Sequence, residues 1–167
     1  MTSQMELFKA LPPDSHRFTD PEKLKEFILA GKAKVTLQSQ KTYKHFTYKI
    51  KKSDGLLWWV SRLGSEDVGY IYLGTIRGDS FSRTKKTLDK DFLSDQFRVW
   101  NWFWTYLTLS KGIPNKLHVY HEGRCGMCGL ELTDPLSIQL GYGPDCRRKK
   151  FKRPAERPPG LTDDLPE

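Results

Sequence analysis

Cysteine is scarce in this 167-residue chain, which contains only three. Three cysteines cannot all pair with one another in disulfides, so the composition indicates thiols that stay reduced in an intracellular compartment. Long apolar runs are also missing, because no stretch reaches the length of about 18 residues that a transmembrane helix needs. The N-terminal residues 1–20 show no basic segment followed by an apolar one, and they predict no secretory signal. We expect a cytoplasmic protein that does not contact a membrane.

The motifs of several enzyme classes are absent as well. The sequence contains no phosphate-binding glycine loop, no G-x-S-x-G and no H-E-x-x-H. Acids such as Glu66, Asp67 and Asp79 fall in predicted turns, where carboxylates are ordinary turn formers. A metal-dependent nuclease needs a cluster of carboxylates or histidines, and the sequence does not display one. We therefore predict that the protein is not an enzyme.

Positive charge is what the chain has in excess. Its 28 Lys and Arg residues against 20 Asp and Glu residues give a formal net charge of +8. This balance favours a polyanionic partner, because a basic surface attracts phosphates. The competing interpretation is a soluble protein that is simply basic. Generic DNA or RNA is accordingly the first partner to consider.

The pattern of apolar residues predicts an α+β fold. After an irregular leader (residues 1–18), residues 19–31 have the features of a short helix, with Thr19 and Glu22 matching a capping box. The segments KAKVTLQS and HFTYKIKKS alternate between apolar and polar residues, which is typical of strands with one buried face. LLWWVSRL and GYIYLGTI are continuous apolar runs, which favour strands covered on both faces. Together these segments predict an antiparallel meander of four to five strands.

A change of period marks the next element. Between residues 92 and 109 the polar residues are spaced by four, three, four and three positions, which is a helical stripe. The rest of this Trp-rich segment is apolar, so we expect the helix to pack across the sheet. The predicted α+β domain therefore spans residues 19–113. Residues 114–153 are expected to form a zinc-binding module that ends in a short basic helix, and residues 154–167 a disordered tail.

All three cysteines lie in one segment with the spacing His121-x3-Cys125-x2-Cys128-x17-Cys146. Glycines next to two of them allow the tight knuckle in which both sulfurs of a C-x-x-C pair point at one centre. The letters GPDC indicate a helix start, where the helix dipole favours a thiolate at Cys146. Three thiolates and one imidazole satisfy the tetrahedral preference of Zn²⁺ and leave no open position. The predicted Cys₃His zinc knuckle is therefore structural.

Two histidines compete for the fourth ligand position. His121 stands just before the C-x-x-C pair, and we predict that it binds the metal. If LHVYH is a strand, His118 points to the opposite face, where a surface or packing role is expected.

The cysteine segment also carries a resemblance. HEGRCGMCGLELTDPLSIQLGYGPDC resembles a C-terminal motif of small phage and bacterial proteins, H-x-G-R-C-x-x-C-G, then L-T-D-P-x-S-I, then G-x-G-P-x-C, which belong to a family of unknown function. The resemblance implies a phage or mobile-element origin and no particular activity. It also implies a metal site, with ligands by motif match at His121, Cys125, Cys128 and Cys146. Leu130 departs from the basic residue of the motif, and Tyr43 departs from a glycine in the predicted hairpin turn.

Basic residues gather in two places. The run after the last cysteine comprises Arg147, Arg148, Lys149, Lys150, Lys152 and Arg153. The outward face of the first two predicted strands carries Lys34, Lys49 and Lys51. Tyr43, in the turn between those strands, is a residue that can stack on an unpaired base. Most other aromatic residues fall at predicted core positions.

Two functions fit these features. The first is a zinc-containing protein that binds DNA or RNA through the basic surface without strong base specificity. The second is a protein-binding inhibitor or adaptor that acts on host replication, transcription or defence machinery. In that case the basic residues meet an acidic surface of a host protein complex.

Overall fold

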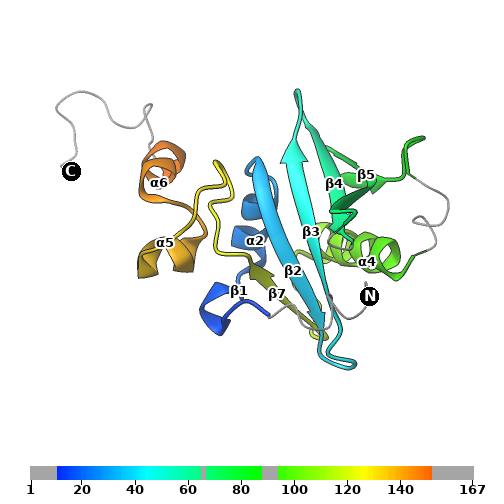
Figure 1. Cartoon of the computed structure of the whole chain (residues 1–167), viewed down its shortest axis with the longest axis horizontal. Coiled ribbons are helices and arrows are strands. Elements are labelled where there is room, and N and C mark those ends of the chain that lie inside the picture. The colour runs from blue at the N-terminus through cyan, green and yellow to red at the C-terminus, as the bar shows by residue number, and fades with distance from the viewer. Residues whose placement is uncertain (1–10, 65–66, 88–93, 152–167) are drawn as a thin grey trace.

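The structure is a computed structural model that describes residues 11–64, 67–87 and 94–151. Figure 1 shows one antiparallel sheet with helices α2 and α4 behind it, and helices α5 and α6 beyond one edge. The elements in chain order are η1 (Asp14–His16), β1 (Arg17–Phe18), α2 (Pro21–Ile28), β2 (Lys32–Ser39), β3 (His45–Lys52), β4 (Leu57–Leu63), β5 (Tyr70–Arg77), β6 (Ser80–Ser82), α4 (Asp95–Ser110), β7 (Leu117–His121), α5 (Pro135–Leu140) and α6 (Pro144–Phe151). The α+β class is therefore confirmed.

The sheet of the described residues has seven strands in the order β1-β7-β2-β3-β4-β5-β6. Strands β2 to β6 form the predicted meander, in which each strand pairs with the next along the chain. Strand β7 returns from the far end of the chain and pairs with β2, with His121 opposite Val35. The segment that we assigned to the zinc-binding module thus contributes a strand to the sheet of the preceding segment.

The expectation of an irregular leader is corrected for residues 14–18. These residues form η1 and β1, and β1 pairs with β7 through Arg17 opposite Tyr120. The short leader strand was not visible in the sequence, because two residues are too few to show a period. The rest of the predicted leader, residues 1–10, lies outside the described residues.

Helix α2 begins one residue later than the capping box implies. Its cap is Asp20, whose carboxylate accepts hydrogen bonds from the backbone N–H groups of Glu22 (2.9 Å) and Lys23 (3.4 Å). The apolar side chains of Leu24 and Phe27 are fully buried. Burying two large apolar side chains stabilises the fold by about 2–3 kcal/mol each, and this fixes the helix against the sheet.

Helix α4 supplies the centre of the core, as the Trp-rich segment predicts. Ser94 caps its first turn by accepting a hydrogen bond from the N–H of Phe97 at 3.2 Å. Trp100 and Trp104 are buried, and their rings stack with centroids 6.1 Å apart. Trp102 points away from the core and is 47% exposed.

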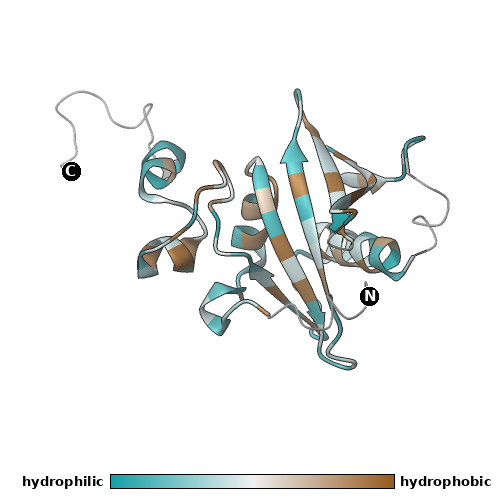
Figure 2. Cartoon of the chain, viewed as in Figure 1, coloured by the Kyte–Doolittle hydropathy of each residue, from teal (hydrophilic) through white to brown (hydrophobic). Residues whose placement is uncertain are grey.

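The prediction that β4 and β5 are covered on both faces is wrong for β4, whereas in β5 residues 73–76 are all buried. Trp58 is buried on the face that α2 and α4 cover, and its indole N–H donates to the carbonyl of Leu29 at 3.1 Å. Trp59 points the other way and is half-exposed, because successive side chains of a strand alternate between faces. We call the face without α2 and α4 the open face. Figure 2 shows the resulting alternation of hydrophilic and hydrophobic bands along β2 and β3.

No helix within the described ranges is long and apolar enough to cross a bilayer.

Candidate metal centre and the adjoining basic groove

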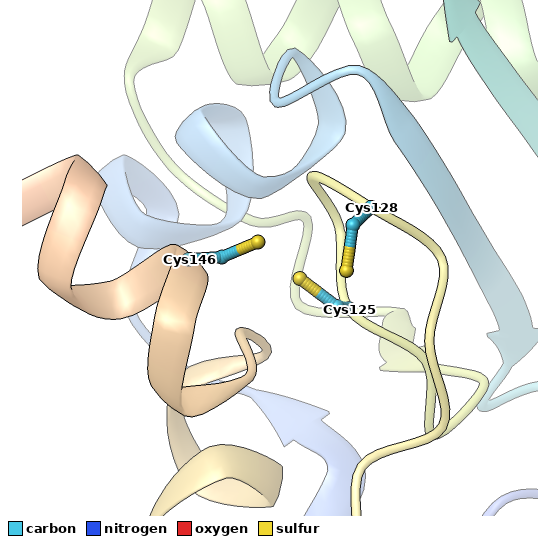
Figure 3. A group of neighbouring side chains, drawn as sticks. All are labelled: Cys125, Cys128 and Cys146. Carbon is cyan, nitrogen blue, oxygen red and sulfur yellow. The ribbon is translucent and has the colours of Figure 1, made fainter.

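The three cysteines converge on one point, as the sequence predicts. The sulfurs of Cys125, Cys128 and Cys146 lie within 4.8 Å of one another. Figure 3 shows the first two on one loop and the third on helix α6, with all three sulfurs directed inward. Two sulfurs on a tetrahedral Zn²⁺ lie about 3.8 Å apart, since each Zn–S bond is about 2.3 Å long. The cluster is therefore close to the arrangement of three thiolates that share a metal ion.

Backbone hydrogen bonds build the loop that carries Cys125 and Cys128. The N–H of Cys125 donates to the carbonyl of Leu130 at 2.8 Å, and the N–H of Gly129 donates to the carbonyl of Cys125 at 2.9 Å. The N–H of Met127 points at the sulfur of Cys125, 3.4 Å away. Gly129 has φ of 82°, a left-handed value that a residue with a side chain rarely adopts. This is the tight knuckle that the C-x-x-C spacing predicts.

The knuckle is held against helix α2 by close backbone approach. The carbonyl of Gly126 accepts a hydrogen bond from Lys32 at the start of β2 (2.7 Å), and its N–H donates to the carbonyl of Gly141 (3.0 Å). A Cβ atom on either glycine would lie 2.8 Å from the ring of Phe27. Only glycine therefore lets both loops close around this ring. The apolar face of α2 thus positions the loop that carries two of the candidate metal ligands.

Helices α5 and α6 bring the third cysteine into place. Asp134 caps α5 by accepting hydrogen bonds from the backbone N–H (3.0 Å) and the hydroxyl (2.6 Å) of Ser137. These bonds, together with the nearby Arg147, hold the pKa of Asp134 below its usual value. The guanidinium of Arg147 also donates to the hydroxyl of Ser137 at 3.0 Å, which ties α6 to α5. Arg147 therefore has a structural role beside the nucleic-acid contact predicted for it.

The structure does not bring His121, the predicted fourth ligand, into the cysteine cluster. Among the described residues the ligand cluster contains the three cysteines and no histidine. The Nδ1 atom of His121 accepts a hydrogen bond from the N–H of Gly123 (3.0 Å), so the proton sits on Nε2, which donates to the carbonyl of Ile138 (2.6 Å). Neither ring nitrogen has a lone pair left for a metal. His121 instead ties β7 to α5, and His118 lies on the opposite face of β7, as predicted.

The thiols differ in acidity. Burial opposes ionisation of Cys125, but hydrogen bonds from backbone N–H groups and from the Cys146 thiol outweigh it, so the pKa of Cys125 lies below its usual value. Burial and the neighbouring sulfurs Cys125 and Cys128 raise the pKa of Cys146 to about 12. A metal ion would reverse this effect, because it stabilises each coordinating thiolate.

A basic groove adjoins the cluster on the open face. Its cavity has a volume of about 390 Å³ and is lined by Lys32, Lys34, Lys49, Lys51, Arg124, Cys128 and Gly129. Lys32 lies opposite Lys51, and Lys34 lies opposite Lys49, in the β2–β3 ladder. The structure thus brings together the three lysines predicted on these strands. It adds Lys32, which the same alternation could have identified, and Arg124, which only the folding of the knuckle brings near.

The other predicted binding residues lie elsewhere. Tyr43 is 67% exposed at the tip of the β2–β3 hairpin, at the end remote from Lys32 and Lys51. On α6, Arg148 pairs with Asp145, and the Nζ of Lys150 lies 5.1 Å from the ring centroid of Tyr142. Lys149 is exposed on the same helix. Lys152 and Arg153, like the predicted tail at 154–167, fall outside the described residues.

Three aromatic residues of the open face were missed by the sequence analysis. Trp59, Tyr70 and Tyr72 are half-exposed, and the rings of Trp59 and Tyr72 lie 5.2 Å apart. The Nζ of Lys49 lies 4.6 Å from the ring centroid of Tyr70. Trp58 and Trp59 point to opposite faces of β4. Both fall within one uniformly apolar run, so the sequence alone did not show which of them is exposed.

Comparison with known proteins adds a family without an assigned activity. Residues 116–150 match the model described as "Family of unknown function (DUF6011)". The match covers β7, the knuckle, α5 and most of α6, and so includes all three cysteines. It agrees with the resemblance found in the sequence. No curated protein matches the chain significantly, and no solved structure does either.

Proposed function

We propose that this chain is a non-enzymatic nucleic-acid-binding protein in which a zinc ion, bound by three cysteines and one further ligand, holds a basic groove in shape. The observation that carries the proposal is the groove itself, where five cationic side chains line one cavity of about 390 Å³. Like charges gathered this closely repel one another, and a bound polyanion relieves the repulsion. A nucleic acid carries one phosphate per nucleotide, so successive phosphates can contact all five cationic side chains.

The metal belongs to the proposal because it shapes one wall of the groove. Cys128 is a wall residue and a candidate ligand at once. Thiolates are soft ligands that select zinc or iron–sulfur centres over magnesium or calcium, and a C-x-x-C knuckle with a distant third cysteine suits one zinc ion. The zinc would neutralise thiolate charge beside the groove and hold Arg124 at its rim. Three free cysteines and the motif resemblance support a cytoplasmic, phage-encoded protein.

Salt-dependent binding tests the proposal. Fluorescence anisotropy with labelled random-sequence oligonucleotides should give an affinity that falls steeply with salt, by about 0.7–0.9 in logarithmic slope for each phosphate contacted. Lys49→Ala with Lys51→Ala should lower this slope by about 1.4–1.8. Lys41→Ala with Lys44→Ala removes the same charge at the exposed hairpin tip and should change it little. Equal effects of the two pairs would show that binding depends on the net charge of the protein and not on the groove.

An apolar surface favours the second candidate, a protein-binding adaptor or inhibitor of host machinery. Trp102, Tyr106 and Leu109 are exposed on α4, away from the groove. Beside them lies a cavity of about 330 Å³ with largely apolar walls, including Phe46 and Trp102, and with Lys41, Lys44 and Lys116 at its margin. Exposed apolar patches with a polar rim mark protein contacts, and the lysines would suit an acidic partner. Capture of one host protein from nuclease-treated lysate, abolished by Trp102→Ala, would support this function.

A further inference from the structure

We propose that the groove and the neighbouring aromatic side chains form one binding platform for single-stranded nucleic acid. The inference rests on the proposed function and narrows it. Residues that face each other across an antiparallel ladder project to the same side of the sheet. The strand register therefore fixes which lysines and which rings share the open face.

Two neighbouring rows of side chains cross the sheet. The first runs Lys34, Lys49, Ser61, Tyr72 over β2, β3, β4 and β5. The second runs Lys32, Lys51, Trp59, Thr75 over the same strands. Each row thus offers two ammonium groups and then one aromatic ring. Adjacent strands are about 4.8 Å apart, so a ring lies within one or two strands of a lysine.

The rings themselves are paired with cations. The Nζ of Lys49 lies 4.6 Å and that of Lys34 lies 5.6 Å from the centroid of the Tyr70 ring. The Nζ of Lys86 lies 5.6 Å from the centroid of the Trp59 ring. A nucleotide carries one phosphate and one flat base, so an ammonium next to a ring complements both. Lysines attracted to ring faces can turn to phosphates at little cost, because cation–π contacts at exposed sites are weak.

The spacing favours a single strand over a duplex. The ring centroids of Trp59 and Tyr72 are 5.2 Å apart and the ring planes are tilted by 53°, whereas bases in a duplex are stacked in parallel at about 3.4 Å. Rings tilted in this way can each take a base that is no longer stacked on its neighbour. The base faces of a duplex are covered by adjacent bases, so they cannot stack on Trp59 or Tyr72. The helices α2 and α4 lie on the other side of the sheet, so the open face itself presents no helix for a major groove.

The test compares three anionic probes by fluorescence anisotropy at one low salt concentration. The probes are oligothymidylate, a duplex of the same length, and inorganic polyphosphate as a competitor that has phosphates and no bases. Wild-type protein should bind oligothymidylate more tightly than the duplex. Trp59→Ala should weaken oligothymidylate binding about tenfold, the effect of losing one base–aromatic stack, and should leave polyphosphate binding unchanged. Oligouridylate of the same length shows whether RNA is taken equally.

Two matched variants guard the result. Trp102→Ala removes an exposed tryptophan on the other side of the molecule and should change no affinity. Trp59→Phe keeps a ring and should retain most of the binding, even if Trp59→Ala folds poorly. The inference is overturned if duplex binds as tightly as the single strand, or if folded Trp59→Ala binds oligothymidylate like wild type. In both cases the proposed function stands, provided that Lys49→Ala with Lys51→Ala still weakens binding. Failure to bind any of the probes overturns the proposed function as well.

Discussion

The imidazole of His16 lies on the imidazole of His121, with ring centroids 4.4 Å apart and the ring planes only 14° from parallel. The Nδ1 of His16 also hydrogen-bonds the carbonyl of His121 at 3.1 Å. This stack joins η1 to β7 beneath the knuckle. A proton on His121 would place a charge in this buried stack, so the packing favours the neutral imidazole.

Acid should therefore destabilise the fold through His121. Burial, together with the nearby His16, lowers the pKa of His121 from 6.5 to about 4, although hydrogen bonding to Ile138 and the charge of Glu122 act the other way. A folded-state pKa below the unfolded one means that protons bind more tightly to the unfolded chain. The contribution of neutral His121 to the free energy of unfolding is therefore fully present above pH 6.5 and is lost as the pH falls toward 4. The difference between the two pKa values corresponds to about 3 kcal/mol.

Urea unfolding at several pH values between 7 and 4 measures this loss. His121→Gln serves as the reference, since an amide can accept from Gly123 and donate to Ile138 without titrating. Protonation of the thiolates affects both proteins equally, so the difference between them isolates the histidine. Parallel curves for the two proteins would contradict the prediction.

Metal content should separate the cysteines from the histidine. Cys128→Ser should lose bound zinc and destabilise the C-terminal third of the chain, because it removes a ligand from the cluster. His121→Gln should retain about one zinc ion per chain, since both ring nitrogens are engaged with the backbone. Elemental analysis of proteins purified without chelators gives the stoichiometry. Loss of zinc in both variants would restore His121 as a ligand, and a metal-free folded wild type would remove the metal centre.

A methyl group at Gly126 should loosen the knuckle. The added Cβ would lie 2.8 Å from the ring of Phe27, a distance that forces one of them to move. We expect Gly126→Ala to cost about 1–3 kcal/mol in unfolding free energy, the usual effect of overpacking. The double variant with Phe27→Leu provides the control, because a smaller side chain makes room and should return part of the loss. Additive losses in the double-mutant cycle would show that the two residues do not compete for the same space.

Removing one negative charge should strengthen polyanion binding. The carboxylate of Glu122 accepts a hydrogen bond from the hydroxyl of Thr36. Burial of the Tyr70 hydroxyl and, to a lesser extent, the charge of Glu122 raise the pKa of Tyr70 to about 12. The carboxylate therefore lies beside the ring that Lys34 and Lys49 approach. Glu122→Gln should raise oligothymidylate affinity by about two- to fivefold at low salt, and less at high salt. Glu22→Gln, an exposed change on α2, should have no effect; an equal gain would indicate net charge alone.

The helix α6 lysines remain a rival binding surface. The basic run after the last cysteine predicts that Lys149→Ala with Lys150→Ala weakens binding without unfolding. The structure places these residues on α6, apart from the groove lining. We expect this pair to reduce affinity less than Lys49→Ala with Lys51→Ala, measured with the same oligonucleotide and salt. The opposite order would move the binding surface to α6.

Local patterns explain what could be predicted. The alternation in β2 and β3, the polar stripe of α4 and the C-x-x-C knuckle each depend on residues close in sequence, so they were readable. The pairing of β7 with β2 could not be predicted, because it joins segments that are far apart in the sequence. The role of His121 was missed for the same reason: its ring is satisfied by Ile138, which only α5 brings near. Trp59 was hidden in an apolar run whose two faces look alike until the helices cover one of them.

The insertion of β7 next to β2 has a consequence for how the chain is made. During synthesis β2 is translated early, but the strand that pairs with its second edge emerges only after β3 to β6 and α4. Until then the backbone groups along that edge lack their partner, which is the condition under which nascent strands join to other chains. Truncated products that stop before Leu117 would keep this edge permanently unprotected. Synthesis of β7, more than the growth of the core, is then the step that closes this edge of β2.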